Sequence, residues 1–342
     1  MVPAGIDAPK VTDWFAANVP QATAPLTFER VAGGHSCLTY VVTDAAGERF
    51  VLRRPPLGHV LATAHDVARE HHIMGGLADT PVPVPLMLGV CNDPAVNEAA
   101  FYVMSHVDGT VLHDRAVVDA ALPTEDLRRR LSDHVVEVLV ALHAVDIEAV
   151  GLGDLARSAS YLDRQLKRWA GQWEASKTRE LPGMEQLHAW LVAHKPAETE
   201  TTIVHGDYRL GNMLVDGGGT VQAILDWELC TLGDPLADLS YLLRSWAMPD
   251  DEPGPNIDPP TRAGGFADHA TLAARYAELS GRDVADLGYW MAFNAWRSAA
   301  IGEGVYRRYI DGKMGAMPDD VEAYARSVDR SVDAGLLFAG LA

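Results

Sequence analysis

The stretch His205-Gly206-Asp207-Tyr208-Arg209-Leu210-Gly211-Asn212, followed after two short strand-like runs by Asp226-Trp227-Glu228, decides the fold class of this chain. Phosphoryl transfer needs a carboxylate beside the attacking hydroxyl, an amide oxygen on the metal a short loop later, and a second carboxylate on the same metal. Asp207, Asn212 and Asp226 supply these three groups in that order. We therefore interpret the stretch as a phosphoryl-transfer site.

The spacing of these residues has a geometric reason. A loop can turn Asp207 toward an acceptor hydroxyl and bring Asn212 back toward a metal five residues later. Residues 213–215 and 221–225 are typical of two short strands around a glycine-rich turn, and this hairpin would return Asp226 to the same cleft. Taken singly, an Asp or Asn near glycines is more often a turn or cap residue. The ordered set favours the functional interpretation.

The segment resembles the aminoglycoside phosphotransferase (choline kinase-like) family, in which Asp-Trp or Asp-Leu replaces the Asp-Phe-Gly of protein kinases. Within that superfamily the chain most resembles the kinase-like domain fused to acyl-CoA dehydrogenases and its free-standing bacterial relatives. The motifs that carry this resemblance are Val51-Leu52-Arg53-Arg54-Pro55-Pro56, Gln165-Leu166-Lys167-Arg168-Trp169, Gly233-Asp234-Pro235-Leu236-Ala237-Asp238 and Arg297-Ser298-Ala299-Ala300-Ile301. The resemblance implies a two-lobed protein kinase-like fold of the α+β class that uses ATP and Mg²⁺.

We expect an N-lobe over residues 1–104, a hinge over 105–109 and a C-lobe over 110–342. Five strand-like runs predict an antiparallel N-lobe sheet, at 26–31, 38–43, 49–53, 86–91 and 100–104. Helices are predicted from Thr12-Asp13 onward, over 65–77, 125–145 and 289–301, from about Pro235, and within a Trp-rich insertion at 151–195. The proline-rich segment 248–265 predicts an irregular loop.

The first turn of the sheet is expected to cover the phosphates of ATP. Gly33 and Gly34 allow backbone N–H groups to approach phosphate oxygens, and Ser36 adds a hydroxyl donor. In the hinge, adenine would meet the backbone at Met104, Ser105 and His106. A Gly-Gly turn is weak support by itself, because hairpins use it freely.

Alternation in the third strand puts Val51 and Arg53 on one face. Val51 can then pack on adenine, while Arg53 takes the position that lysine holds in most kinases and points toward the phosphates. Glu70, on the following helix, is expected to pair with Arg53. Arg54 is the rival candidate for the phosphate contact.

Other polar residues have a supporting or an open role. His205 is expected to fix the catalytic loop through hydrogen bonds, and Asp234 and Asp238 to brace it. Arg297 lies in an apolar helical run, where a buried cation needs a partner, which is either a helix-end carbonyl or a substrate anion. The candidate acceptor-binding residues are Arg209, Glu228 and Arg297, with Lys167 and Arg168 added for a CoA ester.

Composition agrees with an enzyme that acts on small molecules. The 342 residues are 48% hydrophobic and contain no apolar run long enough to span a bilayer, and the start of the chain has no basic segment followed by an apolar one. These features predict a cytoplasmic protein. The net charge of -19 opposes binding to nucleic acid and to anionic membranes. Three widely separated cysteines indicate reduced thiols and no zinc site.

Three functions remain open at this point. The first is a magnesium- and ATP-dependent kinase that phosphorylates the hydroxyl of a metabolite such as a hydroxyacyl-CoA or a hydroxy acid. The second is an aminoglycoside O-phosphotransferase, which the acidic charge would suit. The third is a nucleotide-binding pseudokinase, suggested by the arginine in place of the usual lysine. The acceptor and the oligomeric state do not follow from the sequence.

Overall fold

The computed structural model describes residues 2–31, 37–57, 66–156, 160–198, 200–252, 255, 258–314 and 318–342. The predicted phosphate-binding turn, with Gly33, Gly34 and Ser36, lies outside these residues. The chain forms two compact units. The first comprises residues 1–109, 148–152 and 222–229, and the second comprises the rest. The sequence predicted an N-lobe over residues 1–104, a hinge over 105–109 and a C-lobe over 110–342. Residues 148–152 and 222–229, which cluster with the first unit, fall within the predicted C-lobe.

The first unit is built on a five-stranded antiparallel sheet with the strand order β1-β2-β3-β5-β4. Its strands are β1 (Thr27–Arg30), β2 (Leu38–Thr43), β3 (Arg49–Arg54), β4 (Met87–Cys91) and β5 (Phe101–Ser105). Three helices accompany the sheet, α1 (Ala8–Asn18), α2 (Val67–Leu77) and α3 (Pro94–Asn97). Each strand lies within one or two residues of its predicted range.

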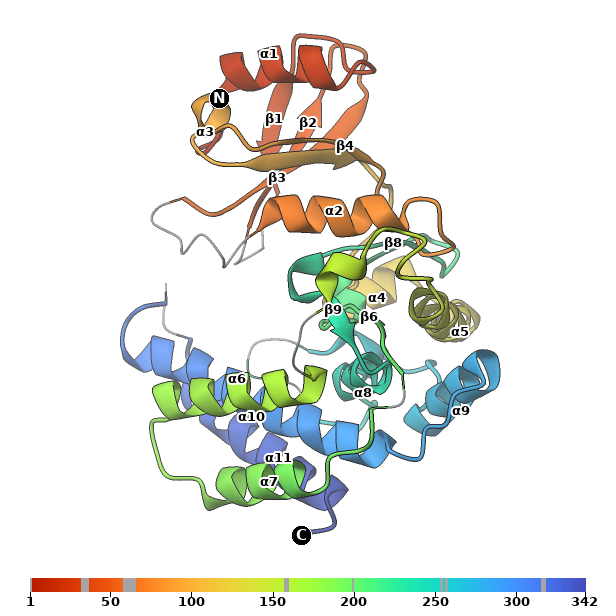
Figure 1. Cartoon of the computed structure of the whole chain (residues 1–342), viewed down its shortest axis with the longest axis vertical. Coiled ribbons are helices and arrows are strands. Elements are labelled where there is room, and N and C mark those ends of the chain that lie inside the picture. The colour runs from red at the N-terminus through yellow and green to blue at the C-terminus, as the bar shows by residue number, and fades with distance from the viewer. Residues whose placement is uncertain are drawn as a thin grey trace. The chain divides into compact units, whose positions relative to one another are not determined.

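Helices α1 and α2 cover opposite faces of this sheet (Figure 1). The α1 face holds the apolar core of the unit, in which Val11 and Phe15 of the helix meet Tyr40 and Leu52 of the sheet. The prediction that α1 starts near Thr12-Asp13 is wrong. The helix starts at Ala8, because the Asp7 side chain caps its first turn by accepting from the N–H of Lys10, and Pro9 suits that turn.

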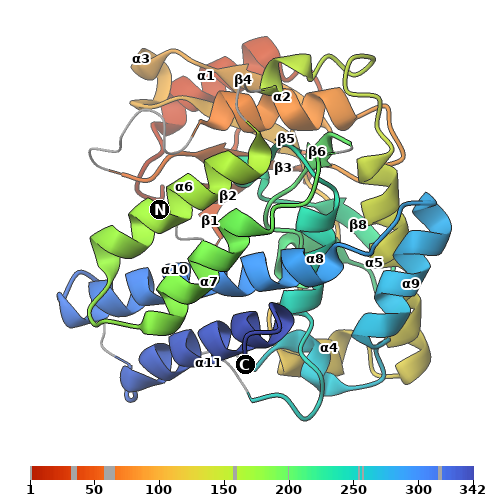
Figure 2. The same ribbon diagram turned by 60° about the horizontal axis from the view of Figure 1, so that its bottom comes forward.

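The second unit is mostly helical. It contains α4 (Arg115–Ala121), α5 (Glu125–His143), α6 (Tyr161–Ser176), α7 (Pro182–Ala193), α8 (Leu236–Ser245), α9 (His269–Ser280), α10 (Leu287–Ile310) and α11 (Glu322–Phe338). Figure 2 shows α6, α7 and α11 alongside α10, and these helices pack against it. Because α10 is surrounded, it buries residues on all sides, including Trp290, Phe293 and Trp296.

Short strands and single helical turns connect these helices. Strand β6 (Thr202–Val204) pairs with β9 (Thr231–Gly233), and the chain passes from the second unit to the first within β8 (Val221–Ile224), which follows β7 (Met213–Val215). The 3₁₀ turns are η1 (Gly153–Leu155), η2 (Leu210–Asn212), η3 (Trp227–Leu229) and η4 (Pro260–Ala263). The turn η4 interrupts the segment predicted to be irregular, where the buried Thr261 hydroxyl donates to the carbonyl of Ala247 at 2.7 Å. None of the described helices combines the length and apolar character needed to cross a membrane.

Candidate active site

The loop after β6 holds Asp207 and Asn212 against each other. The Asn212 side-chain amide donates to the Asp207 carboxylate at 2.6 Å and to its backbone carbonyl at 2.9 Å. The single turn η2 closes the loop between the two residues. Gly206, which precedes Asp207, has a φ of +82°, a conformation that a residue with a Cβ adopts at a cost of about 1–2 kcal/mol. The contact between these two side chains is therefore a local property of the loop.

Two more side chains approach the Asp207 carboxylate. The Nε of Arg209 lies 3.2 and 3.3 Å from its two oxygens. Tyr241 of α8 was not among the predicted site residues. Burial raises the pKa of its hydroxyl, and the charge of Asp207 and a hydrogen bond to Asp207 raise it further. A neutral hydroxyl beside the carboxylate can donate to it, so Tyr241 helps to orient Asp207.

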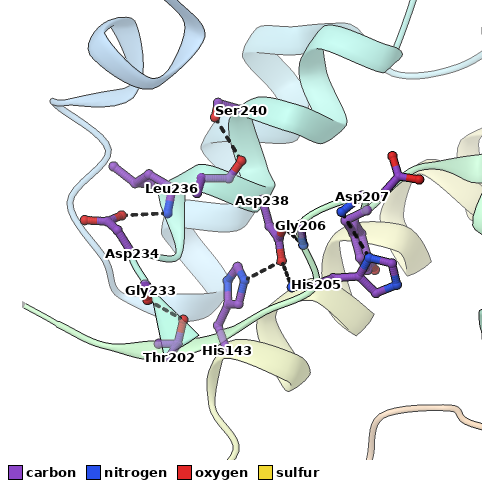
Figure 3. A network of polar contacts seen from close by, with 12 residues as sticks. His143, Thr202, His205, Gly206, Asp207, Gly233, Asp234, Leu236, Asp238 and Ser240 are labelled. Atoms are coloured by element: carbon purple, nitrogen blue, oxygen red, sulfur yellow. Dashed lines mark hydrogen bonds and ion pairs between the residues drawn. The ribbon is translucent and has the colours of Figure 1, made fainter. Parts of the chain in front are cut away.

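Asp238 braces the backbone that carries Asp207 (Figure 3). Its fully buried carboxylate accepts from the N–H of His205 at 2.6 Å and from the N–H of Gly206 at 2.8 Å. The same carboxylate lies 3.6 Å from Nε2 of His143 at the end of α5, and burial lowers the pKa of this histidine. One carboxylate on α8 thus fixes two successive peptide groups of the loop that carries Asp207, the candidate catalytic loop.

His205 acts within the loop. Its side chain is buried, and Nδ1 accepts from the N–H of Asp207 at 3.2 Å. An accepting Nδ1 places the proton of the neutral ring on Nε2. The contact joins the His205 ring to the backbone of the residue that carries the candidate carboxylate.

Arg297 reaches the same loop from α10. It donates from Nη2 to the carbonyl of Gly206 at 2.8 Å, and its guanidinium lies over the rings of Trp169 and Tyr241, 5.2 and 4.9 Å from their centroids. Only 5% of the residue is exposed. The sequence offered a structural partner such as a helix-end carbonyl, or a substrate anion; the carbonyl that Arg297 contacts is that of Gly206, in the loop after β6. The aromatic rings stabilise the buried charge by cation–π contacts.

The remaining candidates for acceptor binding are Lys167, Arg168 and Glu228. Lys167 and Arg168 are exposed on α6, where Arg168 lies over the ring of Trp169 at 5.1 Å. Glu228 is partly buried on η3 of the first unit, where its charge helps to raise the pKa of Glu70 after the larger effects of burial and Asp226. The effect of Glu228 that the structure shows is therefore on the pKa of Glu70, within the first unit.

Arg53 joins two carboxylates in the first unit. Its Nη2 donates to Asp226 at 2.7 Å, and its Nε lies 3.4 Å from Oε2 of Glu70, which also accepts from the Tyr102 hydroxyl at 3.1 Å. Burial raises the pKa of Glu70 to about 7, against the opposing effect of Arg53. The pair predicted from strand–helix order is therefore present, and Asp226 adds a second acid to it.

Arg54 points to the other face of the sheet. The register pairs Arg53 with Tyr102 on the α2 face, so the next residue must face α1. There Nη1 of Arg54 donates to the carbonyls of Gly5 and Asn97. Of the two arginines, Arg53 alone contacts Glu70 and Asp226.

This difference makes a matched pair of substitutions. Arg53→Met is expected to reduce kcat/KM for ATP by about ten- to a hundredfold, because it removes a charge-assisted contact worth about 1.5–3 kcal/mol. Arg54→Met is expected to lower the free energy of unfolding by about 1–3 kcal/mol, since it leaves two carbonyls unpaired, with KM for ATP unchanged. Steady-state kinetics and urea unfolding of both variants provide the check. A larger kinetic effect in Arg54→Met would contradict the assignment of Arg53.

Asp226 is held in an unusual backbone conformation. Its φ is +66°, in the left-handed region that Asp tolerates better than most residues. The turn η3 follows directly, and α2 packs against it. The conformation directs one oxygen of Asp226 to Arg53.

The hinge candidates lie at the end of β5. Met104 is buried and pairs with Val51 of β3, so both belong to the α2 face. Ser105 is already bonded to Leu86, since its N–H donates to the Leu86 carbonyl and its hydroxyl accepts from the Leu86 N–H. Within the described ranges, the backbone N–H of His106 makes no hydrogen bond. The backbone N–H of His106 is therefore available to a purine, whereas the backbone N–H of Ser105 is already bonded.

The proposed metal ligands each keep a free oxygen. Asn212 uses only its nitrogen toward Asp207, and Asp226 uses only Oδ1 toward Arg53. Among the described residues, Oδ1 of Asn212 and Oδ2 of Asp226 accept no hydrogen bond. The same residues contain no cluster of three or more His, Cys, Asp or Glu side chains that could hold a metal. Oxygen donors in small number fit Mg²⁺, which is usually bound by one or two protein ligands together with substrate phosphates and water.

Fold and site together define a protein of the kinase-like α+β class. Residues 27–299 match the model of the phosphotransferase enzyme family (APH). The chain belongs to this family. A crystal structure from Ralstonia eutropha JMP134, provisionally assigned as an aminoglycoside phosphotransferase, is 32% identical and covers 98% of each chain with a TM-score of 0.81.

Curated relatives extend well beyond this chain. Acyl-CoA dehydrogenase family member 10 of Mus musculus is 34% identical over 85% of this chain and 27% of its own length. Acyl-CoA dehydrogenase family member 11 of Gallus gallus is 31% identical over 92% of this chain and 41% of its own length. The chain therefore spans less than half of each of these two relatives. Aminoglycoside phosphotransferase APH(4)-Ia shares the fold, with 18% identity over 90% of this chain and 94% of its own, and a TM-score of 0.61.

Proposed function

We propose that the protein is a magnesium- and ATP-dependent kinase that transfers the γ-phosphoryl group to a hydroxyl of a small metabolite. The observation that carries this proposal is the Asp207–Asn212 pair, in which the amide nitrogen holds the carboxylate at 2.6 Å and the amide oxygen is left for a metal. A residue that only forms a turn or caps a helix does not need an amide nitrogen bonded to a carboxylate together with an amide oxygen that accepts no hydrogen bond. A binding module would not need the carboxylate.

Each proposed role follows from the contacts of one side chain. Asp207 orients the acceptor hydroxyl and receives its proton late in a loose transition state. Arg209 and Tyr241 set the direction of its carboxylate. Asn212 and Asp226 would hold Mg²⁺, which neutralises charge on the phosphates when it is bound. Arg53, kept in place by Glu70, binds the phosphates with a planar fork of donors in place of the usual ammonium.

For the acceptor we propose a hydroxyacyl-CoA or a related hydroxy acid. The support is the similarity to acyl-CoA dehydrogenase family members 10 and 11 along most of this chain, since the names of these relatives associate them with acyl-CoA substrates. An aminoglycoside is the second candidate. It is favoured by the net charge of -19 and by the structure of APH(4)-Ia, which was solved with AMP-PNP and hygromycin B.

The test is ADP release that depends on both Mg-ATP and an added acceptor, measured with hydroxyacyl-CoA esters, hydroxy acids and aminoglycosides in parallel. Turnover with a hydroxyacyl-CoA or hydroxy acid and none with hygromycin B is the expected result. Asp207→Asn serves as the blank. ATP binding without turnover for any acceptor would favour the pseudokinase.

A further inference from the structure

The last turn of α8 carries an arginine, Arg244, that makes no hydrogen bond or ion pair with the residues that the structure describes. Arg244 is partly buried, and its Nε is shut off from solvent with no hydrogen bond. Across the described part of the chain, the guanidinium makes neither a hydrogen bond nor an ion pair. Its terminal nitrogens keep access to solvent, since only Nε is closed off. Burial lowers the pKa of Arg244, and the nearby charge of Asp251 offsets this in part.

Arg244 lines a cavity of about 460 Å³ in the second unit. The apolar part of the wall includes Leu243, Trp246, Met291 and Phe338. Cavities of this size that combine an apolar wall with a few polar groups are typical of small-molecule sites. A fork of donors that faces such a space can bind a carboxylate or phosphate by two parallel hydrogen bonds.

The other charges of the cavity are already engaged. Arg330 pairs with Glu252 at 2.9 Å, and the Asp251 carboxylate accepts from the N–H of Met248 at 2.7 Å. His269 uses Nε2 on the carbonyl of Trp246 at 2.6 Å. Among these charged groups, Arg244 is the one that makes no hydrogen bond or ion pair with the described residues.

The helix dipole explains why a cation lies in the last turn of α8, but it does not explain the burial of the Arg244 side chain. A cation in the last turn of a helix gains about 0.3–1 kcal/mol from the dipole, and Arg244 is the basic residue of the last turn of α8. An exposed side chain would gain the same amount without losing hydration. The dipole therefore does not explain why Nε is buried without a partner.

Arg244 lies on the same helix, α8, as Tyr241, which interacts with Asp207. Tyr241, whose hydroxyl interacts with Asp207, precedes it by three residues, and residues three apart on a helix have Cβ atoms about 5–6 Å from each other. One short helix thus carries both a residue that orients the catalytic carboxylate and, one turn further on, the unpaired cation.

We propose that the cavity at Arg244 is an anion subsite that holds the carboxylate or phosphate of the acceptor. The assignment rests on the proposed kinase function and narrows its acceptor to an anionic hydroxy compound.

The experiment measures binding to the full chain by isothermal titration calorimetry, with and without Mg-ADP, at low ionic strength. The anionic probes are 3-hydroxybutyrate and CoA, and 3-hydroxybutyramide is the neutral match of the first. Arg244→Met keeps most of the side-chain volume and removes the charge. Arg330→Met is the matched control, because Arg330 lines the same cavity but is paired with Glu252.

We expect Arg244→Met to weaken binding of at least one anionic probe by about tenfold or more, with the amide unaffected and Arg330→Met within about threefold of the wild type. Loss of 3-hydroxybutyrate binding identifies a carboxylate as the anion, and loss of CoA binding identifies a phosphate. The melting temperature of Arg244→Met should stay the same or rise, since a cation without a partner is removed.

Three outcomes would overturn the subsite. They are equal affinity of the wild type and Arg244→Met for both anions, no binding of either anion to the wild type, and a fall of several degrees in the melting temperature of Arg244→Met. Turnover assays separate this proposal from the kinase proposal. An unchanged KM for an anionic acceptor in Arg244→Met removes the subsite alone, whereas Arg244-dependent binding without turnover of any acceptor removes the kinase function alone.

Discussion

Replacing Asp207 by Asn is expected to lower kcat by about 10²–10⁴-fold while the fold and the affinity for ATP are retained. The substitution keeps the size of the side chain and removes the charge that, in the proposed function, receives the acceptor proton. Only 18% of the Asp207 side chain is exposed, yet its contacts with Asn212 and Arg209 lie within the loop, so little packing is lost. Acceptor-dependent ADP release, circular dichroism and ATP titration measure the three quantities.

Asp216→Asn is the matched control for this result. Asp216 lies nine residues further along, and its carboxylate accepts from the N–H groups of Gly218 and Thr220 in the turn that follows β7. Asn can make the same turn contacts, so kcat should stay within about twofold of the wild type. Full activity in Asp207→Asn would end the assignment of Asp207 as the catalytic base, and equal losses in both variants would point to damage of the loop.

The features that could be predicted from the sequence depend on residues that lie close together in the chain. Asp207 and Asn212 are five residues apart, so one loop decides their contact and its spacing is visible in the chain. The strands were predictable for a similar reason, because each is a short apolar or alternating run between turn residues. The first helix was predicted to begin four residues too late. Its N-cap, Asp7, lies two residues before Pro9, and an Asp close to a proline is also typical of a loop.

The contacts that the sequence left open depend on tertiary structure. Alternation placed Val51 and Arg53 on one face of the sheet, and Arg54 remained the alternative. Choosing between the two arginines required knowing that α1 packs on one face and α2 on the other. Tyr241 and Arg297 approach the catalytic loop from helices that begin well after it. An arginine in an apolar run signalled a buried partner, but the Gly206 carbonyl could not be named from spacing. A tyrosine in an apolar helix gave no such signal.

The second large effect is expected from Asp238→Asn, which should lower the free energy of unfolding by about 2–4 kcal/mol and reduce kcat at least tenfold. The carboxylate is fully buried and accepts two backbone N–H groups, at 2.6 and 2.8 Å. An amide has one accepting oxygen, so its NH₂ group would face one of these donors. The peptide groups of His205 and Gly206 would then move, and Asp207 with them. Urea unfolding and kcat measured well below the melting temperature provide the check.

Asp234→Asn separates the loop contact from a general effect of removing an acid near α8. Asp234 accepts from the N–H of Leu236 at 2.8 Å, and Asn caps a helix about as well as Asp does. Burial raises the pKa of Asp234 to about 6, above its ordinary value of 3.8. A raised pKa favours the folded protein at low pH, and this contribution is lost as the pH rises through 6. At pH 8 the Asn variant should therefore be at least as stable as the wild type and fully active. If Asp238→Asn behaved in the same way, the two loop N–H groups would not depend on its charge, and the catalytic loop would have to be held mainly by Arg297 and His205.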